Sequence, residues 1–329
     1  MTWRTVMERD LTSVYRSRIG AGAAAVMALA TVVGVGLLAL SNEAAILGGV
    51  VGVFTLVTLA ALVVTGRPRA VAGLTVTFTL AATGFVLLAP TGSPLRDQYT
   101  PEVSGAVTAL GGALSFLVPV VALLASYGAF VRERETGSVR FLLGLPNSRD
   151  DAYLGKLLSR TLVVLLPLLG GLLLAAVLVP AFFEGGGVVA ALGIAVVSVP
   201  YVVLFVGIGL AASAYAETTA RAVAVSVTAF LVLRVGWTAV RFLAVALLDN
   251  PYPKPTWFYW TGRLNPINAY VRLTAGFGGA LEYHPLLARP DEGVSTVATS
   301  PGFAAAVLLA WACVVPVVGL VLFRSRDLL

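Results

Sequence analysis

The chain has 329 residues and a formal net charge of +6, from 22 Lys and Arg against 16 Asp and Glu. Hydrophobic residues make up 58% of the sequence and charged residues only 12%, whereas a soluble domain carries about 25% charge. The composition excludes a soluble globular protein. The excess cations lie at the ends of apolar runs, which argues against a nucleic-acid partner and for an integral membrane protein with membrane lipid as its surroundings.

Residues 1–20 predict an amphipathic helix lying on the membrane surface. Apolar side chains recur there at helical spacing between the arginines Arg4, Arg9, Arg16 and Arg18. A secretory signal is the competing interpretation, because positive charge precedes an apolar run. The run 21–40 is longer than the apolar part of a signal, and further apolar runs follow it, so the surface helix is favoured.

Eight apolar segments are long enough to cross about 30 Å of hydrocarbon as helices. They are 21–40, 44–64, 71–90, 105–131, 157–182, 187–214, 222–248 and 302–323. The expected fold is therefore an all-α polytopic transmembrane bundle, with residues 21–329 forming one permease-like domain of about eight spans. Either half of 44–90 is also compatible with a re-entrant segment, which leaves six spans as the alternative.

Basic residues favour one side of this bundle. If the N-terminus is cytoplasmic, fifteen Lys and Arg fall in inner connections and five in outer ones, while Arg234 and Arg241 lie within 222–248. The positive-inside rule then predicts a multi-pass plasma-membrane protein with both termini cytoplasmic. Six spans give the same orientation. The long connections become a cytoplasmic segment, 132–156, and an extracellular segment, 249–300.

The sequence lacks the residues that an energy source or an active site needs. The pair Gly155 and Lys156 is followed by Leu157, and Asp150 stands where a phosphate-binding loop has its first glycine. A single cysteine and a single histidine exclude an intrachain disulfide and make a Cys/His metal site improbable. We therefore expect no enzymatic activity, no cofactor and no metal in this chain.

The predicted spans contain no Asp or Glu away from their ends, which argues against an ion-coupled secondary carrier. Arg234 and Arg241 are the charges inside the membrane. They are seven residues apart, hence on one face of a regular helix, and are candidates for lining a pathway for an anionic substrate. In the alternative, Arg241 extends to the headgroups and Arg234 is hydrogen-bonded to neighbouring helices.

The outer segment contains a second helix signal. Asn265 is placed to cap a short helix that begins at Pro266, and we expect this helix to run along the outer surface. A cluster of aromatic residues at 252–260 precedes it. These rings suit an interfacial anchor, with a substrate gate as the alternative.

The cytoplasmic segment has a pattern suited to docking. Gly137 interrupts the preceding helix, Val139–Leu145 forms an apolar patch too short to cross a bilayer, and Pro146 ends it. Ser148, with Asp151 three residues later, resembles a capping box that opens the next helix. A short helix between two long ones, basic and apolar together, either docks into a partner or rests on lipid headgroups.

The segment resembles the cytoplasmic signature of the ATP-binding-cassette (ABC) type-2 permeases, which are membrane subunits of many exporters and include the nitrous-oxide-reductase maturation permeases. The resemblance is carried by Glu133, Arg134, Glu135, Gly137, Leu142, Leu143, Pro146, Ser148, Arg149, Gly155 and Lys156. It extends to Asn265, Pro266 and Tyr270 and to the closing Phe323, Arg324, Arg326, Asp327 and Leu328. The signature follows the fourth predicted span here and the second span in the family.

The resemblance implies a permease subunit of an ABC exporter. In that family a cytoplasmic coupling helix, here 139–145, docks on a separate ABC ATPase subunit that binds ATP and Mg. The docking residues would be Glu133, Glu135, Gly137, Val139, Arg140, Leu142, Leu143, Leu145 and Arg149. A second permease copy, identical or related, is the other expected partner. A membrane anchor or assembly scaffold without transport of its own is the alternative function.

Overall fold

The computed structural model describes residues 3–16, 103–136, 148–182, 187–248, 255–277 and 297–325. Every regular element within these ranges is helical. The α-helices are α1 (Trp3–Arg16), α5 (Val103–Ser126), α6 (Val131–Glu135), α8 (Arg149–Phe182), α9 (Gly187–Tyr215), α10 (Thr219–Leu231), α11 (Trp237–Ala246), α12 (Thr256–Arg263), α13 (Pro266–Phe277) and α14 (Pro301–Ser325). A π-helical turn, Val232–Gly236, joins α10 to α11, and a short 3-10 turn, Val297–Thr299, precedes α14.

Five helical stretches are long and apolar enough to cross a membrane. They are Leu110–Glu135, Arg149–Leu173, Gly187–Tyr215, Thr219–Ala246 and Pro301–Ser325. Each corresponds to one of the eight predicted segments. The other three, 21–40, 44–64 and 71–90, lie outside the described residues, so the all-helical fold is confirmed while the number of eight spans stays a prediction.

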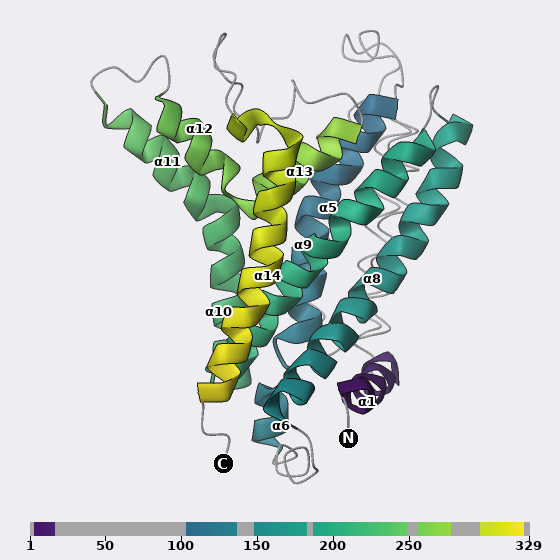
Figure 1. Ribbon diagram of the computed structural model, residues 1–329, viewed down its shortest axis with the longest axis vertical. Helices are drawn as coiled ribbons and strands as arrows, with labels where there is room; N and C mark the ends of the chain where they lie inside the picture. The colour runs from purple at the N-terminus through teal and green to yellow at the C-terminus, as the bar shows by residue number, and fades with distance from the viewer. Residues whose placement is uncertain are drawn as a thin grey trace, which may run out of the picture.

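Helix α9 lies at the centre of the bundle and packs against α5, α8, α10, α13 and α14 (Figure 1). Tyr201 and Phe205 of α9 are fully buried, and the ring of Tyr201 stacks on that of Tyr270 with centroids 4.0 Å apart. Gly207 permits close contact with α14, because a Cβ there would lie 2.9 Å from Cγ of Pro316. Small residues of this kind allow helices to approach closely in lipid, where apolar burial drives association weakly.

Helix α8 begins at Arg149, before the predicted membrane segment 157–182, because Ser148 caps it: Asp151 N donates to Ser148 Oγ at 3.0 Å. The predicted cap is thereby confirmed. The interruption expected at Gly137 lies outside the described residues. The α-helix is interrupted earlier, by a turn at 127–130 between α5 and α6.

Helix α13 begins at Pro266, and the predicted cap at Asn265 is confirmed. Asn265 Oδ1 accepts hydrogen bonds from the backbone N–H of Ile267 at 2.8 Å and of Asn268 at 3.3 Å. The expected surface position of this helix was wrong. Residues 266–271 are buried because α13 packs between α5, α9 and α14, with the Tyr270 ring stacked inside the bundle.

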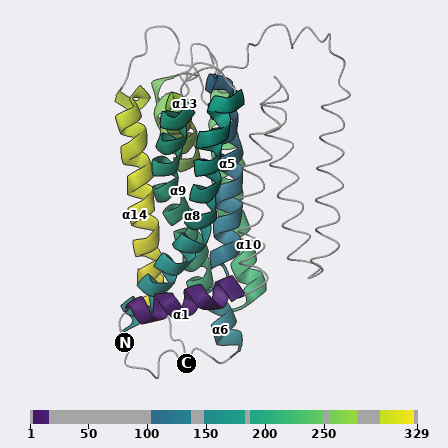
Figure 2. The ribbon, with the colours of Figure 1, turned by 90° about the vertical axis from the view of Figure 1, so that its right-hand side faces the viewer.

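Helix α1 runs across one end of the bundle, nearly perpendicular to the long helices, and packs against α8 (Figure 2). Its side chains Val6 and Asp10 are buried against the protein, whereas Arg4 and Arg9 are exposed. A helix thus forms where the sequence predicts one. Its position at the membrane surface stays a prediction.

Candidate functional site: a junction of helix ends

The described residues of the signature between 133 and 156 lie at the end of the bundle that holds α1; they are Glu133, Arg134, Glu135, Ser148, Arg149, Gly155 and Lys156. The start of α8, the short helix α6 and the C-terminal end of α14 meet there (Figure 1). We call this region the helix junction. It comprises Asp10, Glu133, Arg134, Glu135, Arg149, Asp150, Lys156, Ser159, Arg160 and Arg324, joined by hydrogen bonds and ion pairs.

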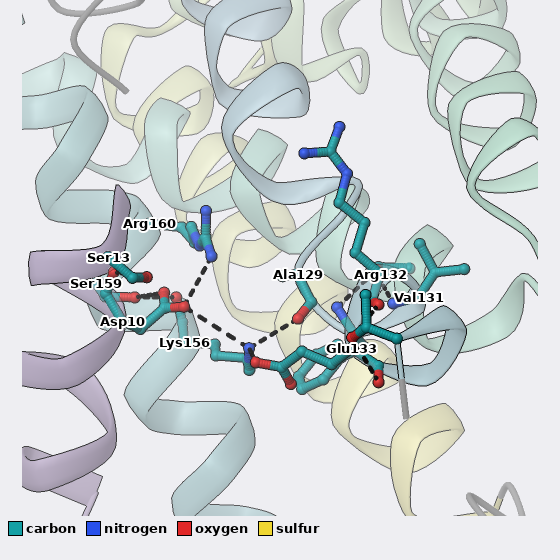
Figure 3. A network of polar contacts seen from close by, with 12 residues as sticks. Asp10, Ser13, Ala129, Val131, Arg132, Glu133, Lys156, Ser159 and Arg160 are labelled. Atoms are coloured by element: carbon teal, nitrogen blue, oxygen red, sulfur yellow. Dashed lines mark hydrogen bonds and ion pairs between the residues drawn. The ribbon is translucent and has the colours of Figure 1, made fainter. Parts of the chain in front are cut away.

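Lys156 is the most buried charge of the junction, at 1% exposed. Its Nζ donates to Glu133 Oε1 and to the backbone carbonyl of Ala129, both at 2.7 Å, and lies 3.7 Å from Asp10 Oδ1 (Figure 3). The ammonium also lies 5.2 Å from the centre of the Phe130 ring. One buried cation therefore joins α8 to α6, to the α5–α6 turn and to α1.

Asp10 supplies the other half of this network. It is 8% exposed and accepts hydrogen bonds from Ser159 Oγ at 2.5 Å and from Arg160 Nη2 at 2.7 Å. Burial raises the pKa of its carboxyl, but the charges of Lys156 and Arg160 and these two hydrogen bonds outweigh burial and hold the pKa below its ordinary value. The carboxylate stays ionised and fixes α1 to α8.

Gly155 allows α1 to approach α8 closely. A Cβ at this position would lie 2.8 Å from the backbone carbonyl oxygen of Trp3 and 2.8 Å from Cβ of Val6. Backbone cannot move aside as a flexible side chain can. The Gly-Lys pair, which cannot be a phosphate-binding loop here, is therefore explained by packing: glycine makes room for α1, and lysine binds the acidic groups around it.

The break between α5 and α6 is held by α9. Where the α-helical pattern ends, the N–H groups of Phe130 and Val131 donate to the buried Ser213 Oγ at 2.9 and 3.1 Å. Arg134 adds hydrogen bonds to the carbonyls of Ser213 and Ala214, the latter at 3.2 Å. These bonds replace the helical ones that the turn loses and fix the direction of α6.

Glu135 binds the start of α10. Its carboxylate accepts from the backbone N–H of Thr219 at 2.7 Å and from the Thr219 hydroxyl at 2.6 Å. A carboxylate at a helix N-terminus satisfies a backbone N–H that has no partner within the helix and interacts favourably with the helix dipole. Glu135 thereby links α6 to the fourth of the five candidate spans.

The C-terminal end of α14 closes the junction. Arg324 donates to the carboxylate of Asp150 through Nε at 2.7 Å and also through Nη2, while Arg149 Nη1 donates to the Arg324 carbonyl at 2.8 Å. Phe323 stacks on Phe130 with ring centroids 4.3 Å apart. Phe323 and Arg324 thus contact residues on both sides of the segment 137–147.

The predicted docking residues divide into two groups. Glu133, Glu135 and Arg149 lie in the junction, bonded to other parts of this chain. The remaining predicted residues lie outside the described part of the chain; they are Gly137, Val139, Arg140, Leu142, Leu143 and Leu145. Their flanks, at 136 and 148, both belong to the junction end (Figure 1).

Sequence reasoning missed Asp10, Ser159 and Ser213, which contact partners 79 or more residues away along the chain. For Asp10 a signal was present: this acidic residue lies at helical spacing from Val6 and Val14, on the apolar side of the helix. An acid in that position needs a buried cation. Nothing in the sequence marks the two serines, because their role depends on where another helix ends.

The candidate pathway arginines contact different helices. Arg234 Nη1 donates to Ser115 Oγ at 3.2 Å, and its guanidinium lies 3.3 Å from the centre of the Phe116 ring, both on α5. Arg241 Nη2 donates to the Phe258 carbonyl on α12 at 2.5 Å. The expectation of one shared face assumed a regular α-helix, and the π turn at 232–236 changes the register between them.

The helices and the apolar surface define a multi-pass membrane protein. Comparison with known families shows which one: the profile described as ABC-2 family transporter protein matches residues 67–328. The chain belongs to the ABC-2 transporter family, whose members are permease components of ABC transporters. The match includes the junction, α1 excepted.

Two relatives carry the printed name "Probable ABC transporter permease protein NosY". The chain is 28% identical over 193 residues to the one from Pseudomonas aeruginosa, covering 54% of this chain and 66% of the relative. It is 30% identical over 119 residues to the one from Stutzerimonas stutzeri, covering 36% and 42%. The matched region thus spans less than two thirds of either relative.

Proposed function

We propose that this chain is the permease subunit of an ABC exporter and that segment 139–145 is its coupling helix. A separate cytoplasmic ATPase subunit would bind ATP and Mg, and its nucleotide-driven movements would reach the spans through this segment. The proposal places both termini and the junction in the cytoplasm. Membership of the ABC-2 family supports the general assignment, and the excess of basic residues at the junction end supports the orientation.

The ion pair between Glu133 and Lys156 carries the proposal. These two residues flank the segment 137–147 on either side and bind each other at 2.7 Å while largely shielded from water. A force applied to the segment therefore reaches α6 and α8 together. Coupling of this kind requires a contiguous set of packed residues that can switch between two discrete arrangements. The junction supplies contiguous contacts to α1, α9, α10 and α14.

Two membrane subunits are needed to enclose a pathway if each ATPase engages one coupling helix, so we propose a dimer of this chain with itself or with a related permease. The outward faces of α10, α11 and α14 carry exposed apolar side chains that suit either lipid or such a partner. Arg234 and Arg241 are proposed to line the pathway for a substrate with anionic character.

Substitution of Leu142 or Leu143 by Asp tests the docking proposal. A charge in the apolar patch opposes burial in the ATPase groove, so we expect copurification of the ATPase to fall by at least about tenfold, the factor that 1.4 kcal/mol produces. The protein remains inserted, because neither residue belongs to a span. Arg221→Gln is the matched control, because Arg221 is exposed on α10 and forms an ion pair with Glu217.

Retained association in both Asp variants contradicts docking through 139–145. An assembly scaffold and a permease are separated by transport itself, measured in vesicles that contain the chain and its ATPase. ATP-dependent transport that the Asp variants lose supports the permease, and ATPase binding without any transport supports the scaffold.

A further inference from the structure

Arg234 is a cation near the middle of a membrane span. It lies in the stretch Thr219–Ala246, about 22 Å along the helix from Thr219 and about 18 Å from Ala246 at 1.5 Å per residue. A charge at this depth destabilises the protein unless it faces the bundle interior or a ligand pathway and has a partner there. The contacts of the Arg234 guanidinium therefore bear on function.

The guanidinium is held against α5. Its Nη1 donates to Ser115 Oγ at 3.2 Å, and its central carbon lies 3.3 Å from the centre of the Phe116 ring. Ser115 is itself fixed, because its carbonyl accepts a hydrogen bond from the buried Tyr201 hydroxyl at 2.8 Å. The surrounding bundle thus positions the cation without any ligand.

The backbone of Arg234 is fixed from a different side. Arg234 is the third residue of the π turn Val232–Gly236, and π turns within helices occur frequently at functional sites. The carbonyl of Leu233, directly before it, accepts a hydrogen bond from Asn265 Nδ2 at 2.7 Å. Contacts from α5 and from the start of α13 therefore converge on this one side chain.

The described part of the chain places its acidic residues far from Arg234. All of them lie at the junction end of the bundle; they are Glu8, Asp10, Glu133, Glu135, Asp150, Asp151 and Glu217. Arg234 is half-buried, and Ser115 Oγ accepts one of its five N–H groups. The positive charge is thus available to an anion from outside the described helices.

The surface around this cation is apolar. The exposed residues next to it in the chain are each at least 50% exposed; they are Leu231, Val232 and Val235. On α5, Phe116 and Val120 are partly exposed. One positive charge in an apolar surface at this depth matches a ligand with one negative charge and an apolar body. A hydrophilic polyanion would leave further charges desolvated and without partners.

We propose that Arg234 binds the charged group of an amphiphilic anion, which carries one negative charge on a hydrocarbon body. The inference rests on the proposed pathway role of Arg234 and narrows the substrate class to hydrophobic monoanions such as a long-chain carboxylate. Guanidinium groups bind carboxylates through paired hydrogen bonds, and the low dielectric of the membrane interior strengthens the attraction. The hydrocarbon chain lies along the exposed apolar side chains of α5 and α10.

Photolabelling of the full-length chain in lipid nanodiscs, without an ATPase, tests this site. The probe is oleate that carries a diazirine, used at a pH where its carboxylate is ionised, and mass spectrometry locates the adducts. We expect adducts on α5 and on residues 227–236 that an excess of unlabelled oleate removes. Oleyl alcohol has the same chain without the charge, and acetate has the charge without the chain, so neither should compete.

Substitution of Arg234 by Gln should lower this specific labelling at least about tenfold, the factor that 1.4 kcal/mol produces. Arg221→Gln, at the exposed start of α10, should be labelled like the wild type. Arg234→Lys keeps the charge without the planar group and should retain more labelling than Arg234→Gln. If Arg234→Gln does not insert, the comparison of oleate with oleyl alcohol in the wild type still decides.

The proposal is overturned if oleyl alcohol competes as well as oleate, or if acetate alone competes. It is also overturned if Arg234→Gln is labelled like the wild type, which would leave Arg234 the role of holding the π turn against α5. Because the assay contains no ATPase, these outcomes do not depend on docking through 139–145. Failure of that docking would leave the labelling unchanged.

Discussion

Lys156 shows what a buried charge contributes at the residue scale. Its ammonium is surrounded by Glu133, Asp10 and the Ala129 carbonyl, and so its desolvation is offset by three oxygen atoms. Removing one partner of a buried ion pair leaves the other charge buried without compensation. This destabilises the protein more than replacing both partners by apolar side chains would. The junction is therefore sensitive to loss of this single side chain.

We expect Lys156→Met to lower the free energy of unfolding by about 3 kcal/mol, the lower end of the cost of breaking a buried pair, because Glu133 is partly exposed and Arg160 still binds Asp10. Denaturant unfolding in detergent measures the change. Arg221→Met is the control: it removes an exposed ion pair with Glu217 and should change stability little. Equal losses in the two variants contradict the role assigned to Lys156.

At the element scale, two long-range contacts determine how helices meet. Helix α1 docks because Gly155 leaves space for it, and the π turn between α10 and α11 is bonded to the start of α13. In the second case Asn265 Nδ2 donates to the Leu233 carbonyl at 2.7 Å while its Oδ1 caps α13. A π turn disturbs the helical hydrogen-bond pattern, and a side-chain amide from a neighbouring element supplies a partner for the carbonyl.

Gly155→Ala should loosen α1, because the added Cβ would contact the backbone oxygen of Trp3. We expect hydrogen exchange of the α1 amides to increase by about tenfold, equivalent to about 1.4 kcal/mol of lost docking. Gly170→Ala in the same helix is a matched control, since a Cβ there has nothing within 4 Å. Unchanged α1 exchange in Gly155→Ala contradicts the packing role.

Asn265→Ala should destabilise the α12–α13 region by about 2–4 kcal/mol, the sum of about 1 for the lost cap and 1–3 for a buried carbonyl left without its donor. Asn265→Ser keeps a capping oxygen but is too short to reach Leu233, so its loss is expected to be smaller. Chemical unfolding of both variants gives the comparison. If Ser is as harmful as Ala, the cap contributes nothing.

At the scale of the whole molecule, charge and aromatic residues differ between the two ends. The junction end holds α1, α6 and most of the described Lys and Arg, whereas the opposite end holds α12 with its aromatic residues. This asymmetry is what the positive-inside rule acts on during insertion.

Single cysteines test this orientation in a Cys313→Ser background. Ser325→Cys, exposed at the end of α14, should react with a membrane-impermeant maleimide only after cells are opened. Trp257→Cys, 40% exposed on α12, should react in intact cells. The reverse pattern contradicts both the orientation and the cytoplasmic position of the coupling segment.

The sequence by itself determined the class of the fold and the positions of most elements. An apolar run long enough to cross the bilayer has few alternatives to a helix, because its backbone N–H and C=O groups must form hydrogen bonds within the segment when they lie in lipid. Local signals at Ser148, Asn265 and Pro266 act over three or four residues, and they located two helix starts correctly.

Only the tertiary structure decided how these helices meet. The burial of α13, the break at 127–130 and the binding of Asp10 to α8 depend on contacts between residues far apart in the chain, and no local pattern encodes them. For the same reason Glu133 and Lys156, which are far apart in the sequence, form an ion pair only when α6 and α8 pack together.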